Sequence, residues 1–378
     1  MNLGSLIDIS RRYGADPEFV LAGGGNTSLK EEQVIAVKAS GVPLADIDES
    51  GFVLLSLPKL KSLFTAVLPS DSEAREKAVL ERLLAARLSG QVRRPSVETL
   101  LHALFPYRFV VHLHPALVNG LMCSRQALIA GESLFGRNAM VLPYITPGYT
   151  LAEAVHRALE QRAASGDEAP HVLFLQNHGV FVAADSADEI DELYAWIVKT
   201  IRERVEPLPA VEPIDPLASA SSESDLVSSL EAVSEKYNVR FFVTSNSLLR
   251  SFLASPEAFE PLTQPFTPDH IVYAGSWPLF IPHSDARSSG ILMARIRQFQ
   301  TEHGELPKIA AIGNFGIVGL GQEESAARHA CELFIDAAKI AWYARSFGGV
   351  HPMQPGDIEF IRSWEVEKYR ASVSRSSS

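Results

Sequence analysis

Short apolar runs in the first half of the chain predict β-strands. They are rich in β-branched and aromatic residues and are bounded by polar or turn-forming residues. The clearest runs are FVLLSL (52–57), PYRFVVHLHP (106–115) and HVLFLQ (171–176). Because these runs alternate with helical patterns, they favour a layered α/β domain.

Two capping boxes mark where amphipathic helices should begin. Ser70 with Glu73 opens residues 72–88, in which apolar side chains return to one helical face. Ser186 with Glu189 opens the last long helix of the first half. In each box a side-chain oxygen can satisfy an N–H group that the first helical turn leaves free.

A segment rich in proline and serine predicts the domain boundary. VEPLPAVEPIDPLASASSESD holds four prolines, which disfavour helix and interior strand, and a serine-rich run follows them. We expect a catalytic domain over residues 1–205, a linker over 206–225 and a second domain over 226–370. Residues 371–378 are expected to form a flexible tail.

One segment in the second half of the chain is similar in sequence pattern to a segment in the first half. Residues 170–190 align without gaps to residues 307–327, and both read as strand, Asn-X-Gly turn, strand and helix. Two unrelated strand–turn–strand units would give a similar pattern. If the segments are a repeat, the informative difference is His178 in the first copy against Phe315 in the second.

Composition narrows the class of protein. With 378 residues, 46% of them hydrophobic and 21% charged, the chain is globular and neither collagen-like nor disordered. A formal net charge of -11 disfavours binding to nucleic acid or to anionic membranes. Only two cysteines, Cys123 and Cys331, and no signal-like or membrane-spanning run predict a cytoplasmic protein.

Three histidines are candidate metal ligands. His112 and His114 flank one residue on a predicted strand, so the two-residue period turns both rings to one face. His178 lies at a turn beside Gly179, at the end of another strand. Three imidazoles suit a catalytic zinc ion with one position left for substrate. A His-X-His pair also occurs as two half-buried strand histidines with hydrogen-bonded rings.

Glu98 is a candidate acid/base. It lies near the start of a short predicted helix, for which Ser96 is the expected cap, and fourteen residues before His112. The alternative is a first-turn glutamate that complements the helix dipole. His102 shares the helix face of Glu98 and is expected to be structural.

Two glycine-containing segments are candidates for binding phosphate. LAGGGNTSLK (21–30) combines three glycines with polar side chains, and its backbone N–H groups could form a nest for oxygen atoms. KASG (38–41) could add further donors. Neither segment has the spacing of a P-loop or of a dinucleotide-binding motif, and tight turns of ordinary structure are the alternative.

These motifs together resemble the class II aldolase/adducin family. Over residues 20–200 the order is Gly-Gly-Asn-X-Ser, X-X-Ser-Gly, Pro-Ser-X-Glu-Thr, His-X-His-Pro and Asn-His-Gly. The chain looks most similar to the aldolase part of bifunctional rhamnulose-1-phosphate aldolase/alcohol dehydrogenase proteins. The resemblance implies a three-layer fold with a central, mainly antiparallel sheet, followed here by a second, degenerate aldolase-like domain.

The resemblance also implies roles for individual residues. It makes His112, His114 and His178 the ligands of one Zn²⁺ per chain, and Glu98 the acid/base. Tyr144, four residues before a glycine, is the candidate that exchanges a proton with the aldehyde oxygen, with Tyr149 as the alternative. The implied phosphate pocket comprises Gly25, Asn26, Ser28, Ser40, Gly41 and Ser96. Val97 stands where the family has a second serine, so one phosphate donor is missing.

The implied reaction is cleavage of a ketose 1-phosphate to dihydroxyacetone phosphate and an aldehyde. A sugar-phosphate epimerase of the same family and a non-catalytic adducin-like module are the alternatives. We expect a small sugar phosphate as the partner, a homo-oligomer, and no binding to nucleic acid or membrane. No Gly-X-Gly-X-X-Gly motif occurs, so no nicotinamide cofactor is expected.

Overall fold

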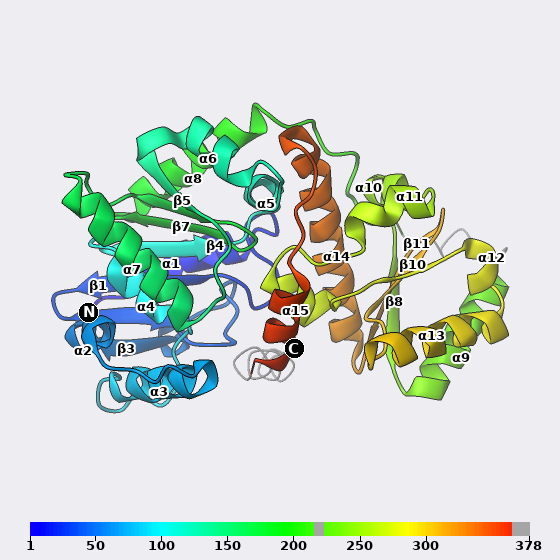
Figure 1. Cartoon of the computed structure of the whole chain (residues 1–378). Coiled ribbons are helices and arrows are strands. Elements are labelled where there is room, and N and C mark those ends of the chain that lie inside the picture. Colours follow the sequence, from blue (N-terminus) through cyan, green and yellow to red (C-terminus); the bar gives the residue numbers. More distant parts are fainter. Residues whose placement is uncertain (215–222, 365–378) are drawn as a thin grey trace. The chain divides into compact units, whose positions relative to one another are not determined.

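A computed structural model describes residues 1–214 and 223–364 of the chain. These residues form two compact units, each with its own β-sheet (Figure 1). Of the described residues, the first unit comprises Met1–Met122 and Gln126–Glu203, and the second comprises Cys123–Arg125 and those from Arg204 to Trp364. In the described part of the chain, no helix combines the length and apolar character needed to cross a membrane.

The first unit is built on a seven-stranded sheet. Its strands are β1 (Asn26–Glu31), β2 (Val34–Lys38), β3 (Phe52–Ser56), β4 (Phe109–Leu113), β5 (Ala139–Leu142), β6 (Val172–Leu175) and β7 (Gly179–Ala184). Their order is β3-β2-β1-β4-β7-β6-β5, and every neighbouring pair is antiparallel except the parallel pair β5 and β6. The expected mainly antiparallel sheet is confirmed, with β3, β4 and β6 inside the three predicted runs.

Helices cover both faces of this sheet, which gives three layers (Figure 1). They are α1 (Gly4–Gly14), α2 (Leu57–Lys61), α3 (Ser72–Ala85), α4 (Thr99–Leu104), α5 (Ala116–Met122), α6 (Ala127–Phe135), α7 (Tyr149–Ala164) and α8 (Ala187–Arg202). Helices α2, α3, α4 and α7 share one buried apolar cluster with β2, β3, β4, β6 and β7. The other face is covered by α1, α5, α6 and α8. Alternate strand residues thus pack in two cores.

The predicted helix starts are partly right. Ser186 accepts a hydrogen bond from the Glu189 N–H, as expected for the start of α8. The box of Ser70 with Glu73 is wrong, because α3 begins at Ser72 and the Asp71 carboxylate accepts the bond from Ala74. Aspartate caps a helix as well as serine does, and the backbone of residue 71 has the extended conformation that a cap needs.

The second unit repeats half of the first sheet. Its strands β8 (Arg240–Thr244), β9 (Leu279–Ile281), β10 (Ile309–Ile312) and β11 (Gly316–Gly321) lie in the order β8-β11-β10-β9. The orientations match those of β4, β7, β6 and β5, including one parallel edge pair. Strands β10 and β11 begin and end 137 residues after β6 and β7, the offset of the sequence alignment. The second aldolase-like domain is therefore a copy built on four strands.

Helices cover the second sheet as well. The helices of the second unit are α9 (Ser224–Tyr237), α10 (Ser247–Phe252), α11 (Pro256–Phe259), α12 (His283–Ala286), α13 (Ser289–His303), α14 (Glu324–Ala344) and α15 (Pro355–Ser363). Helices α9 and α13 share an apolar cluster with the sheet, and α14 packs along β8 and β11. Helix α14 follows β11 as α8 follows β7, which extends the repeat.

The expected linker lies at the start of the second unit. Residues 206–213 form neither helix nor strand, and Ile214 pairs with Ser245 in an isolated bridge. Helix α9 already begins at Ser224, slightly before the expected end of the linker. The expected tail, residues 371–378, lies outside the described residues.

Candidate metal centre

The ends of β4 and β6 bring the candidate metal ligands together. His112 lies on β4, directly opposite Asn26 on β1 and Phe181 on β7. Its Nδ1–H donates to the Val180 carbonyl oxygen over 3.0 Å, which leaves Nε2 of the neutral ring without a proton, as an acceptor. His114 follows the last residue of β4, and its Nε2 lies 2.9 Å from Nε2 of His112.

A tight turn between β6 and β7 adds His178. Asn177 adopts a left-handed φ of 54°, a conformation that asparagine tolerates better than most residues. At Gly179 the chain passes close to β4, since a Cβ there would lie 2.6 Å from Leu113 O. Asn119 donates to the His178 carbonyl over 3.4 Å. The turn therefore holds the His178 ring beside the end of β4.

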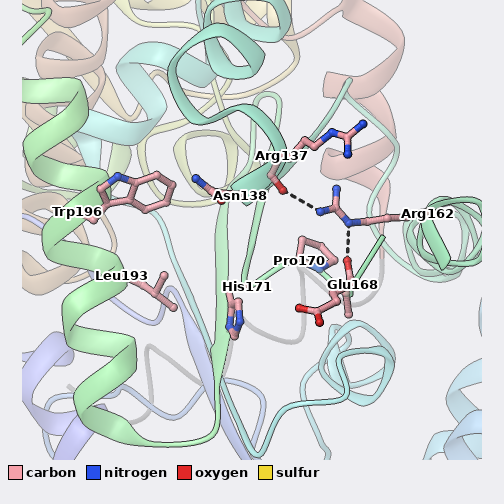
Figure 2. Close-up of a pocket in the computed structure, with 9 residues that line it drawn as sticks. Arg137, Asn138, Arg162, Glu168, Pro170, His171, Leu193 and Trp196 are labelled. Carbon is pink, nitrogen blue, oxygen red and sulfur yellow. Dashed lines mark hydrogen bonds between the residues drawn. The ribbon is translucent and has the colours of Figure 1, made fainter. Parts of the chain in front are cut away.

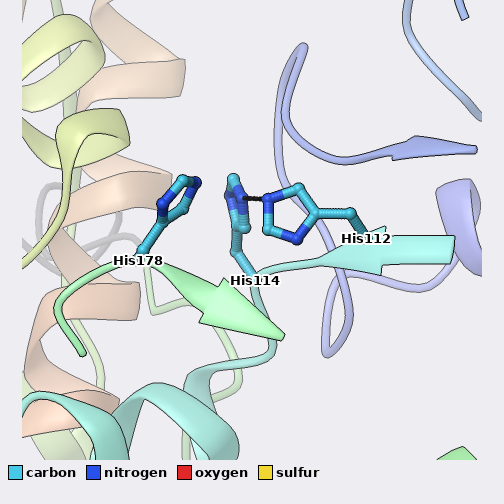
Figure 3. A group of neighbouring side chains, drawn as sticks. All are labelled: His112, His114 and His178. Atoms are coloured by element: carbon cyan, nitrogen blue, oxygen red, sulfur yellow. Dashed lines mark hydrogen bonds between the residues drawn. The ribbon is translucent and has the colours of Figure 1, made fainter. Parts of the chain in front are cut away.

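The three imidazoles form a group suited to one metal ion (Figure 3). One ring nitrogen from each of His112, His114 and His178 lies within 4.8 Å of the others. Burial lowers the pKa of His112 to about 4, so this ring is neutral at pH 7 and can act as a ligand. A carbonyl that fixes the far nitrogen, as Val180 does for His112, is the usual support of a metal-binding histidine.

Glu98 completes the centre from the start of α4. Its Oε1 lies 2.9 Å from His178 Nε2 and 3.3 Å from His112 Nε2. Burial alone would raise the pKa of the Glu98 carboxyl, but charge interactions and hydrogen bonds with His112 and His178 hold that pKa well below its usual range. The three ring nitrogens and the carboxylate oxygen face one another, and each can act as an acceptor in one of its protonation or tautomeric states. Such a set of groups suits a divalent metal ion.

The expected cap of α4 is displaced by two residues. Ser96 was expected to cap the helix, but α4 begins at Thr99 and Glu98 occupies the capping position. The Ser96 hydroxyl instead accepts a hydrogen bond from the Glu98 N–H over 3.2 Å, in a turn that precedes the helix. This turn holds the Glu98 backbone, so that the carboxylate leaves the helix end toward the histidines.

The candidate phosphate residues fall into two groups. Gly25 adopts φ 64° and lies against β4, where a Cβ would be 3.0 Å from His112 O. The Ser40 and Ser96 segments are joined, because Ser40 N–H donates to Arg94 O and Ser96 N–H donates to Lys38 O. Gly41 follows with φ 80°. Each of the two loops thus contains a glycine in the left-handed backbone conformation.

The other two candidates face inward. The Asn26 side-chain nitrogen donates to Glu98 Oε2 over 2.5 Å, and the Ser28 hydroxyl lies 2.8 Å from His102 Nδ1. Asn26 is 4% exposed and Ser28 is fully buried. Their side chains therefore contact other residues of the centre, and His102, which sequence reasoning assigned to structure alone, joins them. Its position four residues after Glu98 on one helix face was the available signal.

The two tyrosine candidates differ in surroundings. Tyr144 is half-buried and its backbone N–H donates to the Gln176 side chain, next to the turn that carries His178. Tyr149 is the first residue of α7, stacks on Phe64 and donates its hydroxyl to Leu63 O inside the core. Tyr144 is thus the tyrosine connected to the histidine turn.

Comparison with known proteins identifies the family. Residues 5–203 match the profile described as Class II Aldolase and Adducin N-terminal domain, which covers more than half of the chain. The chain belongs to the class II aldolase and adducin family. The seven-stranded sheet and its two helical layers are the architecture of the matched region, and the resemblance read from the five motifs is confirmed at the level of the family.

Individual relatives are distant. The uncharacterized oxidoreductase YuxG of Bacillus subtilis is 23% identical over an alignment 416 positions long, which covers 97% of this chain. The chain spans 58% of the length of that relative.

Several solved structures are also similar. The N-terminal class II aldolase domain of a conserved Thermoplasma acidophilum protein is 29% identical, covers 54% of this chain and 93% of its own, and has a TM-score of 0.47. L-fuculose-1-phosphate aldolase from Thermus thermophilus is 18% identical over 53% of this chain and 94% of its own, with a TM-score of 0.34. YgbL of Klebsiella pneumoniae, a putative aldolase/epimerase/decarboxylase, is 19% identical over 54% of this chain and 89% of its own, with a TM-score of 0.37.

A separate hollow of about 340 Å³ lies near the start of β6 (Figure 2). Its walls include Arg137, Arg162, His171 and Trp196. Arg162 donates to the backbone carbonyl oxygens of Glu168 and Arg137, which are themselves part of the wall. His171 likewise donates through Nδ1 to Ala183 O. Arg162 and His171 are thus hydrogen-bonded to backbone carbonyl groups of the protein itself. We assign the hollow no function.

Proposed function

We propose that the protein is a zinc-dependent class II aldolase that cleaves a ketose 1-phosphate to dihydroxyacetone phosphate and an aldehyde. The observation that carries this proposal is the convergence of three imidazoles and one carboxylate on a single point at the ends of β4 and β6. Neutral nitrogen ligands suit zinc, and a carboxylate beside them supplies the acid/base that carbon–carbon cleavage needs.

The chemistry divides between the ion and the chain. When bound to His112, His114 and His178, zinc would supply Lewis-acid stabilisation of negative charge on the oxygens of the three-carbon fragment. In cleavage the bond between C3 and C4 breaks, the C4 hydroxyl loses its proton to form the aldehyde, and C3 gains a proton. We assign the proton at C3 to Glu98 and the proton at the aldehyde oxygen to Tyr144.

The phosphate is assigned to the backbone of the two loops. Gly25 and Gly41 have left-handed backbones that present N–H groups, and Ser40 and Ser96 lie on adjoining segments. Asn26 and Ser28 contribute less directly, because their side chains are bonded to Glu98 and His102. Val97 offers no donor where the family has a second serine.

Two substitutions test the proposal. His112→Ala should abolish zinc retention, because it removes a ligand held in place by two hydrogen-bonded strands. Glu98→Gln should keep zinc and lower the rate of cleavage by roughly 100-fold or more, the scale of a positioned acid/base. Metal content is measured by mass spectrometry. Release of dihydroxyacetone phosphate is followed over a panel of ketose 1-phosphates.

Matched controls use a histidine and a glutamate on the surface of α7. His156 and Glu160 form a pair on that helix, so His156→Ala and Glu160→Gln should change neither zinc content nor rate. Unimpaired turnover in Glu98→Gln would remove Glu98 from the mechanism. Interconversion of sugar phosphates without release of dihydroxyacetone phosphate would indicate the epimerase, and a wild-type protein that purifies without metal would indicate the non-catalytic module.

A further inference from the structure

A chain of buried hydrogen bonds runs from β1 to the catalytic carboxylate. The Ser28 hydroxyl lies 2.8 Å from His102 Nδ1, and His102 Nε2 contacts the Asn26 side-chain oxygen. The Asn26 nitrogen then donates to Glu98 Oε2 over 2.5 Å. The side chains of Ser28 and His102 are fully buried, and Asn26 is 4% exposed. The chain therefore ends on the carboxylate whose other oxygen faces His112 and His178.

If Glu98 is ionised, the direction of every bond in this chain follows. An ionised Glu98 can only accept, so Asn26 presents its NH₂ group to Glu98 and its oxygen to His102. That oxygen can only accept, so the proton of the His102 ring is on Nε2. Burial lowers the pKa of His102 well below its usual value, and the ring is neutral. Its Nδ1 is therefore an acceptor, and Ser28 is the donor.

The same geometry shows what His102 prevents. If the Asn26 amide rotated by half a turn, its oxygen would face the Glu98 carboxylate and two acceptors would meet in a buried site. The proton on His102 Nε2 stabilises the other orientation, because it needs the Asn26 oxygen as its acceptor. With the amide held, Oε2 of Glu98 is occupied and Oε1 is directed at His112 and His178.

We propose that His102 is a positioning residue, which fixes the Asn26 amide so that Glu98 presents one defined oxygen to the reacting centre. This rests on the role proposed for Glu98 as acid/base. The hydrogen bonds of the His102 ring go to Ser28 and Asn26, so His102 acts on Glu98 through Asn26. The His102 ring also packs edge-on against Phe181, with ring centroids 5.5 Å apart. The test must therefore distinguish the positioning of Asn26 from a contribution of His102 to packing.

The first arm of the test compares two substitutions in the zinc-loaded protein. His102→Leu fills much of the ring's space but offers no donor, whereas the side-chain amide of His102→Gln can still donate to Asn26. We expect His102→Leu to lower kcat by about 10- to 100-fold, the usual effect of losing a supporting hydrogen bond in a metal site. KM and zinc content should change little. His102→Gln should restore most of kcat.

The second arm needs neither metal nor activity. In metal-free wild-type protein, ¹⁵N shifts of the His102 ring report which nitrogen carries the proton, and Nε2–H is expected. The Asn26 side-chain amide protons should exchange slowly in the wild type and in His102→Gln, and fast in His102→Leu. These signals test the positioning role even if the wild type shows no cleavage, a result that would count against the proposed function alone.

Three results would overturn the positioning role. One is an Nδ1–H tautomer in the wild type. Another is an Asn26 amide that stays protected in His102→Leu. The third is an equal fall in kcat for the leucine and glutamine variants that follows their loss of thermal stability, because a role limited to packing would affect both variants alike.

Discussion

Lys30 is a buried cation that lies between two backbone carbonyl groups. Its Nζ donates to Phe105 O and to Tyr107 O, each over 2.7 Å, and so ties β1 to the segment between α4 and β4. The residue is 7% exposed. Burial lowers the pKa of Lys30 to about 7 from its ordinary value of 10.5. Like His102, it is a buried polar side chain that joins β1 to a segment distant in the sequence.

This buried lysine predicts how stability depends on pH. Between about pH 7 and pH 10.5 the unfolded chain keeps the Lys30 proton while the folded chain releases it, so stability rises with pH in that window. The slope is at most about 1.4 kcal/mol per pH unit. Urea unfolding near pH 7 and near pH 9 should show a gain of roughly 2 kcal/mol in the wild type that Lys30→Met lacks.

Two further points sharpen that measurement. Burial raises the pKa of Cys331 to about 12, so above its ordinary value of about 9 the unfolded state loses a proton that the folded state keeps, and stability falls. The comparison therefore stops near pH 9. Lys59, an exposed lysine that donates to Ala85 O, provides the control Lys59→Met, which should keep the wild-type slope. An equal gain in Lys30→Met and the wild type would show that Lys30 stays protonated when buried.

Individual helices and strands show which parts of the structure could be predicted from the sequence alone. The apolar runs that contain β3, β4 and β6 were identified because short stretches rich in β-branched and aromatic residues, bounded by polar or turn-forming residues, leave a local signal. The turn at His178 was identified for the same reason, since Asn177 and Gly179 are typical turn residues. The cap of α3 was misplaced by one residue because Ser70 and Asp71 are both good caps, and the backbone conformation decides between them.

Contacts between distant segments could not be predicted in this way. Ser28 and His102 are separated by 74 residues, and Asn26 and Glu98 by 72. Motif resemblance placed Asn26 and Ser28 in a phosphate pocket, whereas their side chains contact Glu98 and His102. Which side of β1 faces α4 depends on sheet register and helix packing, and neither is encoded in a short window of sequence.

The repeated turn offers a matched pair of substitutions at the level of the element. A Cβ on Gly179 would lie 2.6 Å from Leu113 O and 2.7 Å from the His114 ring, and a Cβ on Gly316 would lie 2.6 Å from Thr244 O. Both Gly179→Ala and Gly316→Ala should therefore destabilise the protein, by about 1–3 kcal/mol. Only Gly179→Ala should also weaken zinc retention, because it alone displaces a candidate ligand.

Chemical unfolding and metal analysis of the two variants check this expectation. Gly290, near the start of α13, has open space around its Cβ position, and Gly290→Ala should be neutral or stabilising by up to about 1 kcal/mol. If Gly316→Ala lost zinc as readily as Gly179→Ala, the metal would depend on the second unit. If neither variant were destabilised, the close approach at these turns would be relaxed by small backbone shifts.

At the scale of the whole molecule, the two sheets share topology but differ in the residues at the metal position. His112 pairs with Phe181, and the corresponding pair in the second sheet is Val243 with Val318. The residue two after Val243 is Ser245, in the place of His114, and the turn residue equivalent to His178 is Phe315. All three candidate ligands have thus been replaced, while strand order, turn and following helix are kept.

This replacement predicts one metal ion per chain. Valine and phenylalanine offer no ligand atom, and a serine hydroxyl alone holds a divalent ion poorly. Titration of the metal-free protein with Co²⁺, which reports tetrahedral nitrogen coordination through its visible absorption, should saturate at one equivalent. His112→Ala should remove the absorption, and Phe315→Ala should leave it intact. Saturation at two equivalents would contradict the prediction of one metal ion per chain, and absorption that survives His112→Ala would place the bound metal outside the three-histidine group.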